Sequence, residues 1–318
     1  MNNNITSKTK FEAGSFKTPI LLLIFNRPDI THRVFSAIRE VRPTQLYVAA
    51  DGPRSEYAGD KERCNNTRNI LEKVDWDCEV KTLFREENLG CRLAVSRAID
   101  WFFEAETEGI IMEDDCLPNQ SFFWFCQELL KYFRDDTRIM HIGGTNFQFG
   151  NYPTNDSYYF SRYAHVWGWA SWRRAWKFYD EKMEQFSVEN YNEISLHCND
   201  NQSFTNYWYK VFQQTSNGEI NTWDYQWTFA CWNQKGLSVV PSVNLVSNLG
   251  FSADSTHTYK PSPLANMFTE TINLPLKHPN QVLRHQKADK YVECQQFSRP
   301  ILSRILQYIC RIMGWRNK

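Results

Sequence analysis

The sequence predicts an α/β protein in which helices flank a mostly parallel β-sheet. Short apolar segments that resemble strands alternate with longer segments whose apolar residues recur at helical spacing. In the first half, the strand-like segments are Pro19–Phe25, Gln45–Ala50, Glu79–Phe84 and Gly109–Met112. The first is apolar throughout, which is typical of a strand buried on both faces. Alternation at this spacing indicates βαβ units with right-handed crossovers.

Helices are expected between these strands. The first covers residues 29–41, and either Asp29 or Thr31 can cap its N-terminus. A second helix is expected over about residues 60–74. A third carries apolar residues at helical spacing and ends before Gly109.

The second half of the chain shows further regular patterns. Residues 121–133 predict an amphipathic helix, residues 138–142 a strand, residues 223–234 a helix and residues 237–246 a strand. Between them, residues 158–179 are densely aromatic, and aromatic rings serve both packing and sugar binding.

These patterns divide the chain into four parts. A polar arm (1–17) precedes two halves of the α/β unit (18–135 and 136–260), and a basic tail (261–318) follows. After Leu276 the tail carries nine Lys or Arg against two acids. Residues 299–316 are predicted to form an amphipathic helix, which either lies weakly on an anionic membrane surface or packs on the protein.

Composition excludes several classes of function. Lys plus Arg and Asp plus Glu both number 36, so there is no net charge to attract nucleic acid. Nine cysteines lie scattered without a C-x-x-C pair, which argues against a disulfide framework or zinc site and favours a reduced, cytosolic compartment. The longest strongly apolar run, 20–25, is far shorter than the ~20 residues of a membrane span, so neither export nor membrane crossing is expected.

Polar residues follow the predicted strands. In parallel sheets the ligand lies beyond the carboxyl ends of the strands. We therefore expect one edge of the sheet to collect Asn26, Arg27, Asp51, Glu87, Asn88 and Asp115.

The acidic segment Glu113-Asp114-Asp115 directly follows an apolar strand and is the strongest chemical signal. Burying carboxylates there is costly unless a cation or hydrogen-bond donors balance them. Oxygen ligands suit Mn²⁺ or Mg²⁺, which take one or two carboxylates and complete their shell with phosphate oxygens and water. Such an ion would neutralise a departing nucleotide diphosphate. The alternative is a solvated acidic turn.

The block 109–123 resembles the E-D-D version of the D-x-D motif in GT-A glycosyltransferases, especially the inverting N-acetylglucosaminyltransferases of the Golgi. The chain also resembles bacterial GT-A proteins loosely related to family 2 transferases, which share F-N-R-P, D-G-P, N-L-G-C and H-x-W-G-W-A-S-W. This resemblance covers about residues 18–260. It implies a Rossmann-like GT-A sheet with a nucleotide-sugar-binding half (18–135) and an acceptor-binding, catalytic half (136–260).

The resemblance implies a donor site built on the first two loops. Phe25, Asn26 and Arg27 would lie at the base and ribose, and Asp51 would accept a hydrogen bond from the imide N–H of uracil. Without the resemblance, the first three residues form an ordinary strand-to-helix turn and Asp51 belongs to a tight turn.

Further donor contacts are expected near the phosphates. Arg92 lies just inside a predicted helix, where amides and a guanidinium can meet phosphate or ribose, although it could instead pair with Glu87. Glu113 and Asp114 are assigned to the donor, and Asp115 to the metal ion.

Four downstream residues complete the predicted site. Asp224 resembles the carboxylate that deprotonates the acceptor hydroxyl in the inverting enzymes, or else caps a helix. His257 falls where many GT-A enzymes place a loop histidine on the metal, or else is solvated. Trp167 and Trp169 would form a wall for the donor sugar or acceptor, with core packing as the alternative.

The expected activity is an inverting, Mn²⁺- or Mg²⁺-dependent transfer of a sugar from a nucleotide diphosphate, with UDP favoured, to a glycan or glycolipid acceptor. Cell-surface polysaccharide synthesis and a cytoplasmic location, with peripheral contact at the inner face of the membrane, are part of this expectation. Two alternatives remain. A non-catalytic module could bind nucleotide sugars or glycans on the same fold. A sugar nucleotidyltransferase needs a Gly-rich loop after its first strand, where this chain has F-N-R-P.

Overall fold

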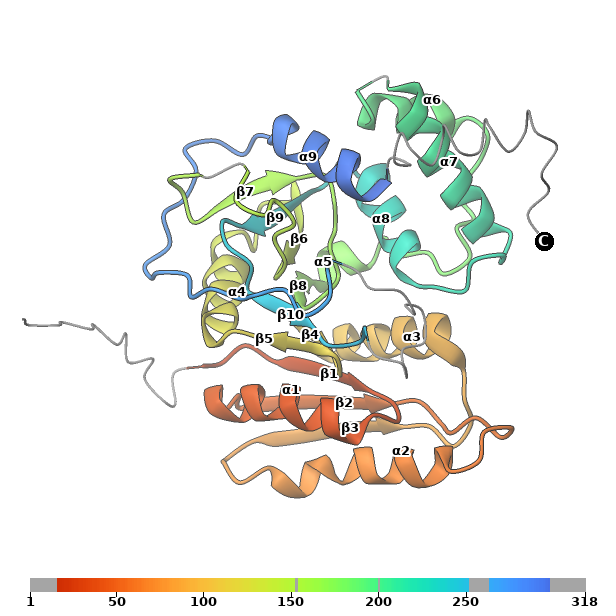
Figure 1. Ribbon diagram of the computed structural model, residues 1–318, viewed down its shortest axis with the longest axis vertical. Coiled ribbons are helices and arrows are strands. Elements are labelled where there is room, and N and C mark those ends of the chain that lie inside the picture. The colour runs from red at the N-terminus through yellow and green to blue at the C-terminus, as the bar shows by residue number, and fades with distance from the viewer. Residues whose placement is uncertain (1–15, 152–153, 200, 252–262, 298–318) are drawn as a thin grey trace, which may run out of the picture.

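A computed structural model describes residues 16–151, 154–199, 201–251 and 263–297. Its centre is an eight-stranded sheet in the order β3-β2-β1-β4-β8-β6-β9-β7, with β3 at the bottom and β7 at the top of Figure 1. The first half contributes four mutually parallel strands to this sheet: β1 (Ile20–Ile24), β2 (Gln45–Ala50), β3 (Glu79–Phe84) and β4 (Glu108–Glu113). The predicted α/β class with a mostly parallel sheet is confirmed.

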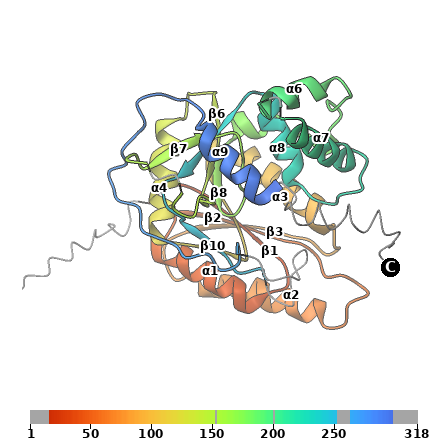
Figure 2. The same cartoon turned by 45° about the horizontal axis from the view of Figure 1, so that its top comes forward.

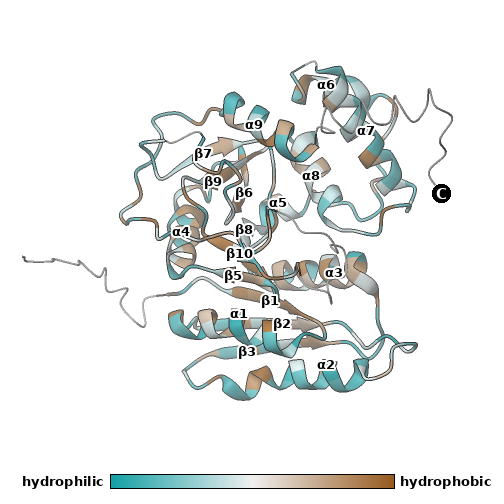
Figure 3. Ribbon diagram, in the orientation of Figure 1, coloured by the Kyte–Doolittle hydropathy of each residue, from teal (hydrophilic) through white to brown (hydrophobic). Residues whose placement is uncertain are grey.

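Two apolar layers enclose the sheet because successive strand residues point to opposite faces. Ile20, Leu22 and Ile24 of β1 pack with α1 (Pro28–Val41) and α4 (Gln120–Tyr132). Leu21 and Leu23 pack on the other side with α3 (Gly90–Ala105), α7 (Gln202–Ser216) and α8 (Asp224–Asn233). In Figure 3, β1 is correspondingly hydrophobic along its length, and the helices carry more polar residues.

The second half extends the sheet with mixed pairing. β8 (Trp169–Trp172) runs antiparallel to β4 and β6 (Ile139–Gly143), and β9 (Leu237–Pro241) runs parallel to β6. β7 (Tyr158–Ser161) pairs antiparallel with β9 at the far edge. Figures 1 and 2 both show α6 (Asn190–His197), α7 and α8 gathered beside this half.

The predicted bounds of helices and strands are most accurate where an element packs on its neighbours in sequence. β2 and β3 have the predicted bounds, and α1 differs by one residue. The helix predicted over 60–74 divides into α2 (Asp60–Arg68) and the 3₁₀ segment η1 (Asn69–Lys73). The predicted caps of α1 are wrong: the cap position is Arg27, and no side chain caps the helix. The Thr31 hydroxyl instead donates to the Arg27 carbonyl oxygen at 2.7 Å.

The strand predicted over 237–246 is interrupted. β9 ends at Pro241, and β10 (Val246–Asn248) leaves the large sheet to pair with β5 (Cys116–Pro118). Since β5 follows the acidic segment directly, this small sheet brings residues 246–250 to the acids. The small strands β7, β8 and the short helix α5 (Arg173–Trp176) lie within the aromatic segment.

The described part of the predicted tail packs on both halves: the backbone N–H groups of Ile272 and Leu276 donate to Ser121 and Glu128 of α4, and that of His285 donates to the Phe160 carbonyl oxygen. Ile272 and Leu276 are core residues, and α9 (Gln286–Val292) and the π-helical η2 (Glu293–Phe297) follow. The predicted amphipathic helix 299–316 lies outside the described residues, as do residues 1–15 of the predicted arm. Within the described part of the chain, no helix is long and apolar enough to cross a membrane.

Candidate functional site

Arg27 joins the β1–α1 loop to the acidic segment at the carboxyl edge of the sheet. Its Nε donates to Asp114 Oδ2 at 3.3 Å, and its Nη2 forms an ion pair with Asp114 Oδ1. Its Nη1 donates to Asp115 Oδ2 at 3.0 Å. The Asp114 side chain is only 4% exposed and that of Asp115 14%, so one guanidinium balances two largely buried carboxylates. The acidic segment is therefore not a solvated turn.

Glu113 is the last residue of β4 and has a strongly perturbed carboxyl group. Its pKa is raised to about 8, first by burial and then by the negative charges of Asp115 and Asp114, against the opposing charge of Arg27. Burial also raises the pKa of Asp114, and Arg27 opposes this effect. Perturbed carboxyl groups at the ligand edge of a sheet mark a candidate site.

Asp115 is held by the backbone of the segment after β10. Its carbonyl oxygen accepts from Leu249 N–H at 2.8 Å. The next residue, Gly250, approaches the carboxylate so closely that a Cβ there would lie 2.3 Å from Asp115 Oδ2. Sequence analysis did not single out Gly250, because the contact spans more than 130 residues.

The residues at this edge fit a divalent cation only if a bound diphosphate supplies the other ligands. Asp115 Oδ1 accepts only a weak hydrogen bond, from Cys116 Sγ at 3.4 Å. Because this bond is weak, the oxygen can still serve as a ligand to a hard cation. Among the described residues, no group of three or more His, Cys, Asp or Glu could hold an ion. One carboxylate suits Mn²⁺ or Mg²⁺ that shares its shell with a diphosphate. The predicted ligand His257 lies outside the described residues.

Asn26 and Phe25 belong to a polar network that ties the first loop to the segment after β2. The Asn26 amide donates to Asp60 Oδ1, and Asp60 also accepts from Arg54 Nε at 2.8 Å. The Arg54 guanidinium lies 5.2 Å from the Phe25 ring centroid. Asn26 thus positions the loop in the structure, and its predicted contact with a nucleotide stays a prediction, as does that of half-buried Phe25.

Asp51 connects the turn after β2 to the start of α3. Its carboxylate accepts from the backbone N–H groups of Leu89 (2.9 Å) and Gly90 (3.0 Å), from the Asn88 side chain (2.9 Å) and from Gly52 N–H (2.9 Å). These bonds use both oxygens for intramolecular donors. The structure therefore gives Asp51 a positioning role, and its bond to a base stays a prediction.

The first turn of α3 lies close to the acids and to Asp224. Burial raises the pKa of the Cys91 thiol to about 12, and the charges of Glu113, Asp224 and Asp115 raise it too. Asp224 also raises the pKa of Glu113. Arg92 is half-buried, forms no ion pair with Glu87 among the described residues, and its buried Nε has no partner there. A guanidinium near the acidic edge could meet a phosphate.

Asp224 begins α8 and faces a cavity of about 170 Å³. The position before it is Trp223, and no side chain caps the helix, so the alternative that Asp224 is an N-cap is wrong. Its Oδ1 accepts a hydrogen bond from the Thr222 hydroxyl. The carboxylate is thus oriented by a neighbour, as a general base requires.

The two predicted tryptophans have different environments. Trp167 is half-buried and lines the cavity. Its ring contacts the Phe251 ring edge-on, with 5.6 Å between the ring centroids. Trp169 is fully buried and stacks on Trp223 and His141, with ring centroids 5.7 and 5.1 Å apart, respectively. The Trp169 ring therefore packs in the core, which was the alternative to the predicted ligand wall.

Sequence reasoning also missed cavity residues from distant elements. Trp208 comes from α7, and Gln296 and Phe297 come from η2. A tryptophan at helical spacing is ordinary core, and Gln296 lies in a segment predicted to be a separate tail, so no local signal identified them.

Comparison with known proteins gives weak likenesses. No protein-family model matches the sequence, and no curated protein matches it. Solved structures with some likeness include HddC from Yersinia pseudotuberculosis, at 9% identity over 54% of this chain and 81% of that chain, with a TM-score of 0.30. A 4-diphosphocytidyl-2C-methyl-D-erythritol synthase from Anaerococcus prevotii matches at 8% identity over 62% and 99% of the two chains (TM-score 0.34). A UDP-glucose pyrophosphorylase complexed with UDP-glucose matches at 9% over 71% and 90% (TM-score 0.35). At these values the likenesses carry no argument about activity.

Proposed function

We propose that this chain is an inverting, divalent-metal-dependent glycosyltransferase that uses a nucleotide-diphosphate sugar, with UDP as the expected nucleotide. The observation that carries the proposal is the Asp224 carboxylate at the start of α8, which lines a cavity, accepts a hydrogen bond from Thr222, and raises the pKa of Glu113 through its negative charge. An oriented carboxylate beside a phosphate-binding edge is the arrangement that transfer to a hydroxyl group needs.

In this proposal the first half of the chain holds the donor. Arg92 provides a guanidinium group for the diphosphate, and Arg27 orients Asp114 and Asp115 next to the base and ribose. Asp115 holds Mn²⁺ or Mg²⁺ together with donor oxygens, with His257 as a further expected ligand. The ion would neutralise charge on the leaving nucleotide. Because the protein supplies few ligands, the ion should bind well only together with a nucleotide diphosphate.

Asp224 supports the chemical step in the second half. The acceptor oxygen attacks the anomeric carbon from the face opposite the diphosphate, and its proton moves to the Asp224 carboxylate. As the new C–O bond forms, the bond to the phosphate oxygen breaks and its electron pair leaves with the nucleotide. A single displacement of this kind inverts the anomeric configuration.

The test measures nucleotide release and donor binding with the full chain. UDP-, GDP-, CMP- and dTDP-sugars are compared with and without Mn²⁺, for the wild type, Asp224→Asn, Asp115→Asn and a control, Asp29→Asn, whose carboxylate is exposed on α1. We expect Asp224→Asn to lower turnover about 10²- to 10⁴-fold with donor affinity unchanged. Asp115→Asn should lose metal-dependent donor binding. Full turnover in Asp224→Asn, or a product that retains the donor configuration, would refute the mechanism.

A second candidate is a sugar nucleotidyltransferase, the class that the pyrophosphorylase among the matching structures names. Here the loop after β1 has no glycine, and Arg27 from that loop pairs with the acids. The same protein, given a nucleoside triphosphate and a sugar 1-phosphate, distinguishes the two. Pyrophosphate release without any turnover of nucleotide sugars would favour the second candidate.

A further inference from the structure

Two residues that line the cavity beside Asp224 each carry a buried hydrogen-bond donor without a partner among the described residues. Trp208 is 97% buried, lines the cavity, and its indole Nε1 has no partner among the described residues. The same holds for Nε2 of Gln296, whose nitrogen is buried in the cavity wall. Buried donors are rarely left unpaired in native proteins, so two of them in one cavity indicate a ligand with acceptor oxygens.

The described lining residues of the cavity disfavour anionic ligands. No Lys or Arg is among its described lining residues, and Asp224 is the one acidic group there. Burial lowers the pKa of His165, which also lines the cavity, to about 4, so its imidazole is neutral at pH 7. A phosphate or carboxylate would therefore meet a negative charge and no cation.

Size and shape narrow the ligand further. The volume of about 170 Å³ is below the roughly 300–1,000 Å³ of sites that enclose drug-sized molecules. Aromatic rings of Tyr163, Trp167 and Phe297 form much of the wall, and such rings pack on apolar faces. A hydroxyl group can both accept from the orphan donors and donate to Asp224.

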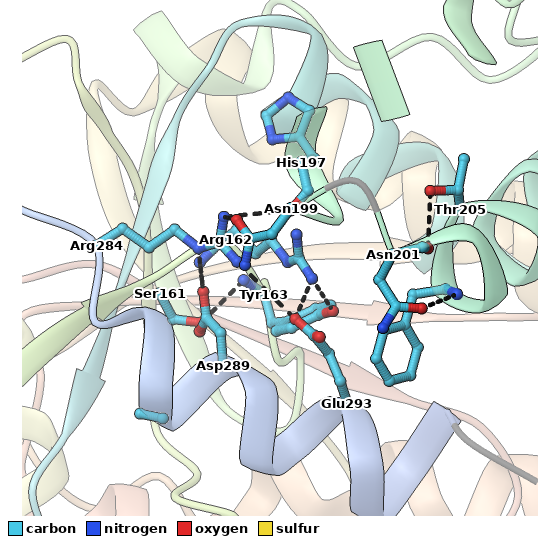
Figure 4. A network of polar contacts seen from close by, with 12 residues as sticks. Ser161, Arg162, Tyr163, His197, Asn199, Asn201, Thr205, Arg284, Asp289 and Glu293 are labelled. Atoms are coloured by element: carbon cyan, nitrogen blue, oxygen red, sulfur yellow. Dashed lines mark hydrogen bonds and ion pairs between the residues drawn. The ribbon is translucent and has the colours of Figure 1, made fainter. Parts of the chain in front are cut away.

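A buried ionic network holds the η2 wall of the cavity in place (Figure 4). Arg162, directly after β7, forms an ion pair with Glu293 of η2 and donates to the Tyr163 hydroxyl at 2.9 Å. Asp289 of α9 accepts from Ser161 Oγ and Arg284 Nε, both at 2.5 Å. The network fixes the segment that carries Gln296 against the second half of the sheet.

We infer that this cavity is the acceptor subsite of the proposed transferase and binds one neutral sugar ring, with Trp208 Nε1–H and Gln296 Nε2–H donating to ring hydroxyl oxygens. Calling the bound sugar the acceptor rests on the proposed function, whereas binding of a sugar in this cavity does not require catalysis. Trp208 and Gln296 are then specificity-determining residues.

The experiment measures binding of the neutral methyl glycosides of glucose, galactose, mannose and N-acetylglucosamine to the full chain by ligand-observed NMR. Trp208→Phe keeps an aromatic ring but removes the N–H, and Gln296→Met keeps the length but removes the amide. The matched controls are Gln295→Met, at the exposed neighbouring position, and Trp76→Phe, whose indole N–H donates to the Pro43 carbonyl oxygen away from the cavity.

At least one glycoside should bind, and each cavity variant should weaken it roughly fivefold to tenfold, the effect of one lost hydrogen bond. The controls should stay within about twofold, and UDP affinity should be the same in all variants. Absence of glycoside binding, or wild-type affinity in both cavity variants, would overturn the inference. If the glycosides bind with this pattern but no nucleotide sugar is turned over, the subsite stands and the proposed function fails.

Discussion

The buried ion pair between Arg162 and Glu293 allows a sharp test of how the cavity wall is held. Both side chains are almost fully buried, at 1% and 3% exposure. The Nε and Nη1 of Arg162 already have no hydrogen-bond partner among the described residues. In Glu293→Gln the side chain keeps its shape and one acceptor oxygen, but the arginine loses its nearest counter-charge.

We expect a large loss of stability from Glu293→Gln. Removing one partner of a buried ion pair typically costs about 3–5 kcal/mol, because a buried charge is left uncompensated. The retained amide oxygen places the expectation at the lower end, about 3 kcal/mol. For a chain of this size, about 2 °C per kcal/mol translates this into a Tm lower by about 6 °C.

The assay is urea and thermal unfolding of the wild type, Glu293→Gln and the double variant Arg162→Met/Glu293→Leu. The double variant should recover most of the loss, since replacing both charges by apolar groups removes the unpaired charge. Asp75→Asn is the control, because its pair with Arg39 is half exposed and should matter little. Equal stability of Glu293→Gln and wild type, or a double variant no better than the single one, would refute the reasoning.

Gly250, Asp51 and His141 offer further tests. Gly250→Ala places a Cβ against Asp115. Mn²⁺-dependent UDP binding, measured by calorimetry, should therefore weaken at least about tenfold, with an unchanged circular-dichroism spectrum. Equal affinity would contradict the contact. Asp51→Ala leaves the donors at the start of α3 unpaired and should lower the free energy of unfolding by about 2 kcal/mol in urea, whereas an unchanged midpoint would refute the positioning role. Burial lowers the pKa of His141 to about 3 from 6.5, so stability is full above pH 6.5 and falls as the pH drops toward 3. Relative to its own stability at pH 7.5, His141→Gln should lose less on acidification, and an equal slope would show that another group is responsible.

The sequence alone predicted the α/β class and the first four strands because their signals are local. The run at β1 is apolar at every position, and β2 and β3 are separated from it by segments of helical spacing. The acidic segment was also recognisable, since three acids after an apolar strand have few structural explanations. The rule that parallel strands end at one edge predicted that Arg27 and Asp115 lie at the same edge, but their ion pair was found only in the structure.

Only the tertiary structure showed the roles of residues that depend on partners distant in sequence. Trp167 and Trp169 stand two positions apart in one motif, yet one lines the cavity and the other lies fully in the core. Asp51 accepts hydrogen bonds from residues 88–90, and the Asp115 carboxylate lies against the backbone of Gly250. Gln296 enters the cavity from a segment that the charge pattern had set apart as a tail. Periodicity reports on which face of its own element a residue lies, whereas these roles depend on which other element packs against that face.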